Sequence, residues 1–254
     1  MQLRDKVAVV TGGGRGIGLA IALGLAEEGV HIAIADIDEE NATKAASEIA
    51  KRGVKSFGVM TDVTSPESVR AMVDRVGEEI GPIQILVNNA ARLPGFSTFV
   101  EEKNSGAAAE MWANIVDVCY HGVINCTAAV IEGMVERKYG KIINMASDAG
   151  KVGEPRQAVY AGAKGAIIAF TKSIAKEAGR YGINVNAICP SMTKTEAVRQ
   201  MLSDEFEAKV VKAYPMRRLG EPQDIANLAV FLASERAGWI TGQAISVNGG
   251  YATA

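Results

Sequence analysis

Short runs of apolar residues alternate with longer stretches of helical spacing along most of the chain. Apolar runs at residues 7–10, 31–35, 56–60, 83–87, 141–145, 185–188 and 244–247 are typical of buried strands. Helical spacing covers residues 17–28, 39–51, 109–134 and 159–180, and Ser65 with Pro66 suits the start of one more helix. This alternation predicts strand-helix-strand units around one parallel sheet.

The chain contains no internal repeat, low-complexity tract or linker that would divide it. A length of 254 residues suits one α/β domain, so we expect a single domain over residues 1–254, with helices on both faces of a doubly wound parallel sheet. Two segments, at about 92–106 and 191–215, follow predicted strands without a regular pattern. Because ligands of open α/β sheets bind beyond the carboxyl ends of the strands, these segments are the expected substrate loops.

Composition and charge exclude several classes of protein. Hydrophobic residues make up 48% and charged residues 22% of the chain, as in an ordinary folded domain. Its 27 basic and 29 acidic residues give a formal charge of −2, which offers no electrostatic reason to bind nucleic acid. The three cysteines form no C-x-x-C pair, so neither a disulfide framework nor a metal site is expected. No cleavable leader or 18-residue apolar stretch is apparent, so we expect a cytoplasmic protein without a membrane partner.

A glycine-rich turn, Thr11-Gly-Gly-Gly-Arg-Gly-Ile-Gly18, joins the first predicted strand to the first predicted helix. Glycines in this place let the backbone approach a pyrophosphate, whose charge the helix N-terminus attracts. The spacing differs from the common G-x-G-x-x-G pattern, and such a turn also occurs without a nucleotide. The residues expected to contact a dinucleotide here are Gly12, Arg15, Gly16, Ile17 and Gly18.

Asp36 ends the second predicted strand, 18 residues after Gly18. A carboxylate there accepts hydrogen bonds from the adenosine ribose hydroxyls and repels a 2′-phosphate, so the sequence favours NAD over NADP. Arg15 indicates the opposite choice, since an arginine could bind a 2′-phosphate, although a solvated loop arginine is the simpler interpretation. Further strand-end residues are either cofactor contacts or ordinary turn residues: Asp62, Val63, Asn88, Asn89 and Ala90.

Tyr160 and Lys164 lie four residues apart on a predicted helix and therefore share one face. An ammonium one turn away stabilises a phenolate and should lower the tyrosine pKa from about 10 toward neutral pH. Ser147, at the end of a predicted strand, offers a hydroxyl to orient a substrate oxygen. A Y-x-x-x-K pattern alone is common on helix surfaces, but beside a nucleotide-binding turn it predicts an acid–base site.

The order of these motifs resembles the short-chain dehydrogenase/reductase family across essentially the whole chain. The resemblance implies a Rossmann-like fold and an NAD(P)-dependent oxidoreductase. It implies that Tyr160 is the general acid and base, that Lys164 lowers its pKa and holds the nicotinamide ribose, and that Ser147 binds the reacting oxygen. It also implies that Thr193 and Thr195 contact the nicotinamide carboxamide. Family members are usually tetrameric, which implies a homotetramer with its two longest helices at one interface and its C-terminal segment at another.

The sequence departs from the family where D-V-N-L-x-G is usual, because the aligned stretch Asp117-Val-Cys-Tyr-His-Gly122 places Cys119 at the asparagine position. By resemblance, that asparagine holds a water of a proton relay, and a thiol is a weak donor and acceptor. Asn114 lies five residues earlier, off that helix face, and His121 is more simply a surface histidine. We interpret Cys119 as a buried packing residue rather than a nucleophile. The departure keeps open a second hypothesis, a non-catalytic subunit of a hetero-oligomer.

The expected reaction is reversible hydride transfer between a nicotinamide and a secondary alcohol or ketone. Expected substrate contacts are Asp148, Gln157 and Met192, with Val152, Arg92 and Phe96 nearby. The basic residues of the same lobes fit an anionic substrate such as a carboxylate or CoA thioester, or are simply solvated: Lys151, Arg156, Lys194 and Arg199. Residues 145–153 resemble the corresponding segment of 2-hydroxycyclohexanecarbonyl-CoA dehydrogenases, which favours a cyclic or CoA-linked hydroxyacyl substrate. The other enzymatic hypothesis is an NADPH-dependent 3-oxoacyl-thioester reductase, which Arg15 favours and Asp36 opposes.

Overall fold

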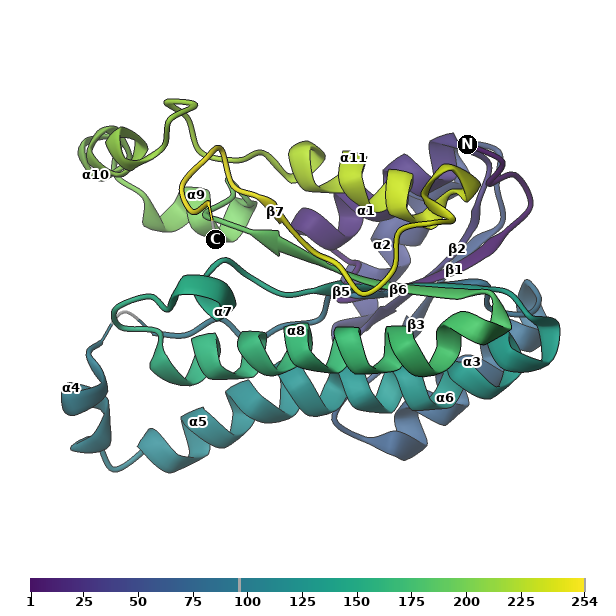
Figure 1. The fold of residues 1–254 in the computed structure, drawn as a ribbon, viewed down its shortest axis with the longest axis horizontal. Coiled ribbons are helices and arrows are strands. Elements are labelled where there is room, and N and C mark those ends of the chain that lie inside the picture. The colour runs from purple at the N-terminus through teal and green to yellow at the C-terminus, as the bar shows by residue number, and fades with distance from the viewer. Residues whose placement is uncertain (96, 254) are drawn as a thin grey trace.

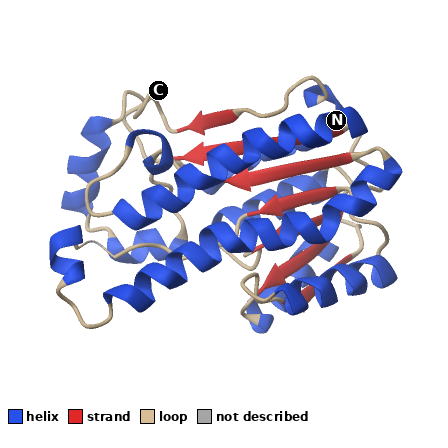
Figure 2. Ribbon diagram, turned by 60° about the horizontal axis from the view of Figure 1, so that its bottom comes forward, coloured by secondary structure: helices blue, strands red, loops and turns tan. Residues whose placement is uncertain are grey.

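Seven strands form one sheet in the computed structural model, which describes residues 1–95 and 97–253. The strands are β1 (Val7–Thr11), β2 (His31–Asp36), β3 (Ser56–Met60), β4 (Ile85–Asn88), β5 (Gly140–Met145), β6 (Ile183–Pro190) and β7 (Ala244–Val247). Their order is β3-β2-β1-β4-β5-β6-β7, every neighbouring pair is parallel, and the arrows in Figure 2 point toward one edge. The order reverses between β1 and β4, which confirms the predicted doubly wound, Rossmann-like sheet.

Helices cover both faces of this sheet (Figure 1). On one face lie α1 (Gly16–Glu27), α2 (Glu39–Ala50) and α11 (Pro222–Ala233), and on the other α3 (Pro66–Glu79), α6 (Gly122–Arg137) and α8 (Ala158–Ala178). Because side chains of a strand alternate between the faces, Ala8 and Val10 of β1 belong to the first core, whereas Val7 and Val9 belong to the second. The continuous apolar runs of the sequence thus correspond to strands buried on both sides.

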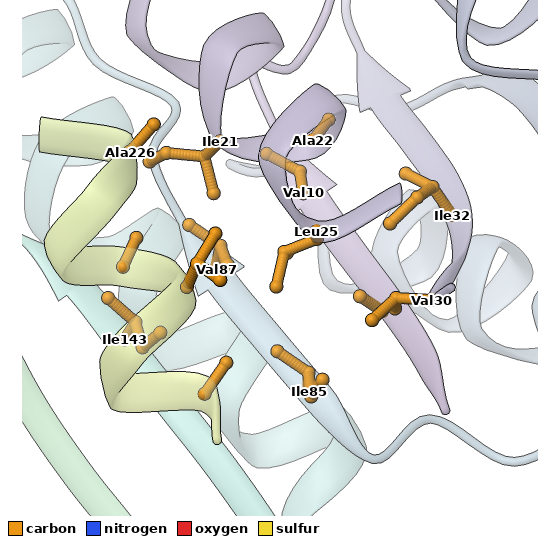
Figure 3. Close-up of a cluster of buried hydrophobic side chains, with 14 of the residues drawn as sticks. Val10, Ile21, Ala22, Leu25, Val30, Ile32, Ile85, Val87, Ile143 and Ala226 are labelled. Atoms are coloured by element: carbon orange, nitrogen blue, oxygen red, sulfur yellow. The ribbon is translucent and has the colours of Figure 1, made fainter. Parts of the chain in front are cut away.

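Figure 3 shows the first core, where α1 packs onto the strands. Ile21 and Leu25 of α1 are fully buried and belong to the same cluster as Val10, Val87 and Ile85. Burying a side chain of this size is worth roughly 1.5–3 kcal/mol. This packing fixes the N-terminus of α1 beside the carboxyl ends of β1 and β4, where the candidate site lies.

The long helix predicted over residues 109–134 is interrupted by a π-helical turn. α5 (Ala108–Val116) passes into η1 (Asp117–His121) before α6 begins. A spacing of 3.6 residues cannot reveal one extra residue in a turn, so the apolar pattern alone predicts one long helix. No apolar stretch of 18 residues was apparent from the sequence. The helical stretch Ala108–Arg137 is nevertheless long and apolar enough to cross a membrane, a test that the core helix of a globular protein also passes.

Short helical elements occupy the two segments predicted to be irregular, and others occur elsewhere in the chain. They are α4 (Phe99–Lys103), α7 (Ala149–Val152), α9 (Glu196–Met201) and α10 (Asp204–Val210), with 3₁₀ turns η2 (Gly179–Tyr181), η3 (Val211–Ala213) and η4 (Glu235–Ala237). Of these, α4, α9, α10 and η3 lie in the two segments predicted to be irregular. Each of α4, α9 and α10 begins at a side-chain cap, from Thr98, Thr195 and Ser203 respectively. Such caps support a helix where the apolar pattern is too short to predict one. These helices gather beyond the carboxyl ends of the strands, at the left of Figure 1.

Candidate active site

The glycine-rich turn packs closely on the end of β4. Gly12 has a left-handed φ of 59°, and a Cβ there would lie 2.9 Å from the Ala90 Cα. A Cβ on Gly18 would lie 2.6 Å from the Asn89 side-chain nitrogen. That nitrogen donates to the carbonyl oxygens of Thr11 at 3.0 Å and Gly12 at 2.8 Å. The turn therefore requires glycine at both positions, and Asn89 holds its shape.

Thr11 is a structural residue of the site that the sequence analysis missed. Its hydroxyl accepts hydrogen bonds from the backbone N–H groups of Asn89 at 3.0 Å and Ala90 at 3.1 Å. The residue is only 1% exposed. A hydroxyl residue at the end of an apolar strand was the available signal, because a buried hydroxyl needs partners. Thr11 joins the ends of β1 and β4 around the turn.

The N-terminus of α1 fits a phosphate group. Its N-cap residue, Arg15, makes no side-chain capping hydrogen bond, and its first turn carries no acidic residue. The N-cap residues of α2 and α3, Asp38 and Ser65, do cap their helices. The first N–H groups of α1, from Gly16 and Ile17 onward, are therefore suited to an anion. Together with the narrow glycine turn, this donor set fits the pyrophosphate of a dinucleotide.

Asp36 lies against the turn at the end of β2. Its carboxylate accepts hydrogen bonds from the backbone N–H groups of Gly14 at 2.9 Å and Asp38 at 3.1 Å. A carboxylate has about four lone-pair sites, so these two bonds leave acceptors for further donors. The exposed neighbour Ile37 brings no positive charge to this place. The edge of the turn thus carries a fixed negative charge with spare acceptor capacity.

The other strand-end residues make structural contacts of their own. Asn88 is buried, and its side-chain nitrogen donates to the Asn144 side chain at 2.8 Å, within the sheet. Asp62 accepts from the Thr64 N–H at 2.9 Å, as a turn residue does, and Val63 is buried. The contacts of Asn88 involve its side-chain nitrogen, whereas its buried side-chain oxygen has no hydrogen-bond partner among the described residues. The predicted cofactor contacts of Asn88, Asp62 and Val63 stay predictions.

Ser147, Tyr160 and Lys164 converge where β5 and α8 meet. Lys164 is 2% exposed and donates from Nζ to the Met145 carbonyl oxygen at 2.6 Å. The same Nζ lies 5.6 Å from the centroid of the Tyr160 ring, and the Ser147 side chain is near enough to Tyr160 to act on the pKa of its phenol. These three side chains, which we call the catalytic trio, are therefore brought together as their spacing suggests.

Burial shifts the pKa values of Tyr160 and Lys164. It raises the pKa of the Tyr160 phenol above its ordinary value, and the nearby Cys119 thiol adds to this, against the opposing effect of Ser147. Burial likewise lowers the pKa of Lys164. Burial thus acts against the expected lowering of the Tyr160 pKa by Lys164, whose Nζ donates to the Met145 carbonyl oxygen in this state. Tyr160 is a neutral phenol at pH 7, ready to donate a proton.

Cys119 lies at the π-helical turn, beside the trio. It is fully buried in a cluster with Ile115, Ala163 and Tyr160. Its thiol donates to the carbonyl oxygen of Arg92 at 3.5 Å. Cys119 therefore ties the segment after β4 to the helix that carries Tyr160, which fits its interpretation as a packing residue.

Replacing Cys119 by asparagine is expected to keep turnover within about threefold of the wild type or to raise it, because an amide N–H can also donate to the Arg92 carbonyl. The larger side chain should overpack the cluster and destabilise the fold by about 1–3 kcal/mol. Steady-state rates and the melting temperature measure the two effects. Cys126→Ser, on the buried face of α6, is the matched control. A large loss of turnover in Cys119→Asn alone would show that the site depends on the thiol.

The segment after β6 faces the glycine-rich turn. A Cβ on Gly16 would lie 3.2 Å from the Cγ2 of Thr195, so the two segments are in contact range. Thr193 is buried beside it, and the Met192 N–H donates to the Tyr214 hydroxyl at 3.3 Å. The structure thus brings Thr195 to the predicted cofactor turn and anchors the neighbouring Met192.

The other predicted substrate contacts lie on both sides of α7. Asp148 is buried and accepts a hydrogen bond from the Ser246 hydroxyl of β7 at 3.0 Å. Lys151 donates to the same hydroxyl at 3.0 Å. Gln157 is the N-cap residue of α8, without a side-chain capping bond, and lies about one turn before Tyr160. Phe96 lies outside the described residues.

Ion pairs engage two of the four basic residues proposed to attract an anionic substrate. Lys194 pairs with Glu207, and Arg199 pairs with Glu221 at 2.8 Å. These carboxylates compete with any anionic group of a substrate. The structure therefore weakens the argument for an anionic substrate at these two positions.

Comparison with known proteins gives matches over nearly the whole chain. A family model described as enoyl-(acyl carrier protein) reductase matches residues 12–252. The 3-oxoacyl-[acyl-carrier-protein] reductase FabG of Staphylococcus aureus is 39% identical over 246 residues, which make up 96% of this chain and 97% of that protein. The 2-(S)-hydroxypropyl-CoM dehydrogenase 3 of Xanthobacter autotrophicus is 38% identical over an alignment of 254 residues, which covers 98% of this chain and 97% of that protein. A solved structure of NAD+-bound xylitol dehydrogenase has a TM-score of 0.91 at 33% identity, covering 98% of this chain and 100% of that one.

Proposed function

Because this chain belongs to the short-chain dehydrogenase/reductase family and is an oxidoreductase acting on CH–OH groups, we propose that it interconverts a secondary alcohol and a ketone with NAD as its preferred cofactor. The observation that carries the proposal is the convergence of Ser147, Tyr160 and Lys164 at the same end of the sheet as the glycine-rich turn. When bound, the nicotinamide supplies the acceptor or donor of hydride. Proton transfer and orientation fall to the protein.

Tyr160 is the acid–base group of the proposed mechanism. In ketone reduction its phenol donates a proton to the carbonyl oxygen, and in alcohol oxidation its phenolate takes the proton of the hydroxyl group. The Ser147 hydroxyl binds the same oxygen and holds it against Tyr160. Lys164, anchored by the Met145 carbonyl, stabilises the phenolate as charge develops and, with Tyr160, holds the nicotinamide ribose.

The dinucleotide is assigned to the turn and the neighbouring strand ends. Asp36 would accept the adenosine ribose hydroxyls, which favours NAD over NADP, and Thr193 and Thr195 would approach the nicotinamide carboxamide. The uncapped end of α1 would take the pyrophosphate. The remaining proposed contacts are Gly12, Arg15, Gly16, Ile17, Gly18, Asp62, Val63, Asn88, Asn89 and Ala90.

The proposed substrate is a cyclic secondary alcohol or a CoA-linked hydroxyacyl compound. Of the two, the ion pairs of Lys194 and Arg199 favour the cyclic alcohol, because fewer cations are left for the phosphates of CoA. Gln157 and Met192 would line the substrate side of the site, and Asp148 would lie behind them.

A second candidate function is NADPH-dependent reduction of a 3-oxoacyl thioester. The 39% identity to a 3-oxoacyl-[acyl-carrier-protein] reductase and the exposed Arg15 favour it. The carboxylate of Asp36 opposes it, because a 2′-phosphate there would meet a like charge.

Titrating the purified protein with NADH and, separately, NADPH tests the cofactor assignment through nicotinamide fluorescence. We expect NADH to bind at least about tenfold more tightly, because like charges brought together cost several kcal/mol. A turnover screen then uses cyclohexanol with NAD+ and acetoacetyl-CoA with each reduced cofactor. Turnover of acetoacetyl-CoA with NADPH alone would favour the second candidate. Binding of neither nucleotide would overturn the proposal and favour a non-catalytic subunit.

We further propose that the single domain of residues 1–254 assembles as a homotetramer in the cytoplasm. The groove between α6 and α8 has a volume of about 390 Å³ and includes the apolar side chains of Ile131, Val135 and Ile174, which suits contact with another copy. All three cysteines are free and buried, which suits a reducing compartment.

A further inference from the structure

The position of Ser147 depends on the short helix α7, which begins two residues later. The Ser147 hydroxyl accepts a hydrogen bond from the Ala149 N–H at 3.2 Å, and its carbonyl oxygen accepts one from the Gly150 N–H at 3.0 Å. Ser147 is therefore built into the first turn of α7, so any displacement of this helix also displaces the serine.

Gly150 seats α7 directly on the backbone of α8. A Cβ on Gly150 would lie 2.6 Å from the Lys164 carbonyl carbon, 2.7 Å from the Gly165 nitrogen and 2.9 Å from the Lys164 oxygen. All three are backbone atoms in the middle of a long helix, so they cannot turn aside as the end of a flexible side chain does. The contact is reciprocal, because a Cβ on Gly165 would lie 3.3 Å from the Gly150 oxygen. Hydrogen alone fits at position 150.

The other side of α7 is fixed to the sheet. The Asp148 N–H donates to the Pro190 carbonyl oxygen at 3.0 Å, at the end of β6. The Asp148 carboxylate accepts from Ser246 at 3.0 Å, and Lys151 donates to the same Ser246 hydroxyl at 3.0 Å. A larger residue at position 150 would push α7 against these bonds instead of into open space.

We propose that Gly150 is a positioning residue that sets the separation between Ser147 and the Tyr160–Lys164 pair. Gly150 of α7 contacts the backbone of Lys164 in α8. The distance between these two helices therefore determines the distance between Ser147 and the Tyr160–Lys164 pair. This inference rests on the proposed function, since it takes Ser147, Tyr160 and Lys164 as the reacting groups. A methyl group at position 150 moves the serine hydroxyl away from the phenol while the glycine-rich turn stays intact.

Gly150→Ala is the test, with Gly165→Ala as a milder variant and Gly162→Ala as the control. A Cβ on Gly162 meets nothing within 4 Å, although this residue lies between Tyr160 and Lys164 on the same helix. With the substrate found in the turnover screen, we expect kcat to fall by about 10- to 100-fold in Gly150→Ala, by less in Gly165→Ala and by less than about twofold in Gly162→Ala. The dissociation constant of NADH should change by less than about twofold, because α7 carries none of the residues assigned to the cofactor.

A crystal structure of each variant gives a readout that needs no substrate. The distance from Ser147 Oγ to the Tyr160 oxygen should increase in Gly150→Ala and stay at the wild-type value in Gly162→Ala. An unchanged distance with unchanged kcat, or an equal fall of kcat in Gly162→Ala, would overturn the inference. If Gly150→Ala does not fold, the same comparison is decided by Gly165→Ala. If Tyr160→Phe keeps full turnover, the proposed function fails instead, whatever the glycine variants do.

Discussion

Tyr160→Phe is expected to lower kcat by about 10²- to 10⁴-fold while the protein still binds NADH, since Lys164 and the glycine-rich turn keep their proposed cofactor contacts. The phenol is the proton donor proposed for the reacting oxygen, and phenylalanine removes that proton without changing the ring. The loss should therefore appear in kcat, with the melting temperature close to that of the wild type. Steady-state kinetics with the substrate from the screen, and fluorescence titration with NADH, measure the two quantities.

Tyr181→Phe is the matched control for this variant. Tyr181 lies in η2 at the far end of α8 and stacks on Arg180, away from the trio. It should keep full turnover. Wild-type kcat in Tyr160→Phe would remove Tyr160 from the acid–base role and, with it, the proposed mechanism.

The pH profile of the wild type adds a second measure of the same group. Because the pKa of Tyr160 lies above its ordinary value of about 10, the proton-donating form is fully populated at neutral pH and is lost only as the pH rises through that higher pKa. The kcat/KM of ketone reduction should therefore stay level through pH 9, whereas that of alcohol oxidation should rise with pH over the same range. A fall of the reduction rate between pH 7 and 8 would contradict this assignment.

Asp36→Ala is expected to weaken NADH binding by about 10- to 100-fold and to bring NADPH within about threefold of it, since a hydrogen bond to a charged group contributes roughly 1.5–3 kcal/mol. The variant removes both the acceptor for the ribose hydroxyls and the charge that repels a 2′-phosphate. Fluorescence titration with both reduced nucleotides measures the ratio of the dissociation constants.

Two further variants separate the effect of charge from support of the turn. Asp36→Asn removes the charge but keeps an oxygen for the Gly14 N–H, so it should relax the discrimination with a smaller loss of NADH affinity. Asp74→Ala, on an exposed position of α3, removes a carboxylate elsewhere and should leave both dissociation constants unchanged. An unchanged ratio in Asp36→Ala would show that another residue selects the cofactor.

The layers of the fold could be predicted because local patterns determine them. The apolar run at residues 7–10 corresponds to β1, whose side chains are buried alternately in both cores. The glycine-rich turn and the Tyr160–Lys164 spacing were likewise visible, since each lies within one short segment and a helix puts residues four apart on one face. Such features need no knowledge of distant parts of the chain.

Contacts between distant segments could not be predicted in the same way. Asp148 finds its partner Ser246 98 residues later, and Gly150 rests on the backbone of a helix that the sequence shows only as a separate apolar pattern. The pKa of Tyr160 depends on how completely the surrounding protein excludes water, which spacing along a helix does not reveal. The local sequence therefore identified the three side chains of the trio. It did not reveal the pKa shift of Tyr160 or the contacts of Asp148 and Gly150 that hold Ser147 in place.

The π-helical turn at residues 117–121 amounts to the insertion of one residue into an otherwise continuous helix. Since an α-helix advances about 100° per residue, the insertion rotates the side-chain register of α5 by roughly that angle relative to α6. α6 can then keep its apolar face on the sheet while Cys119 is turned toward the Arg92 carbonyl and the helix of Tyr160. Deleting any one residue of this turn would restore a regular helix at the expense of that alignment. The extra residue thus allows one continuous helix to pack on the core through α6 and to contact the helix of Tyr160 through the π-helical turn.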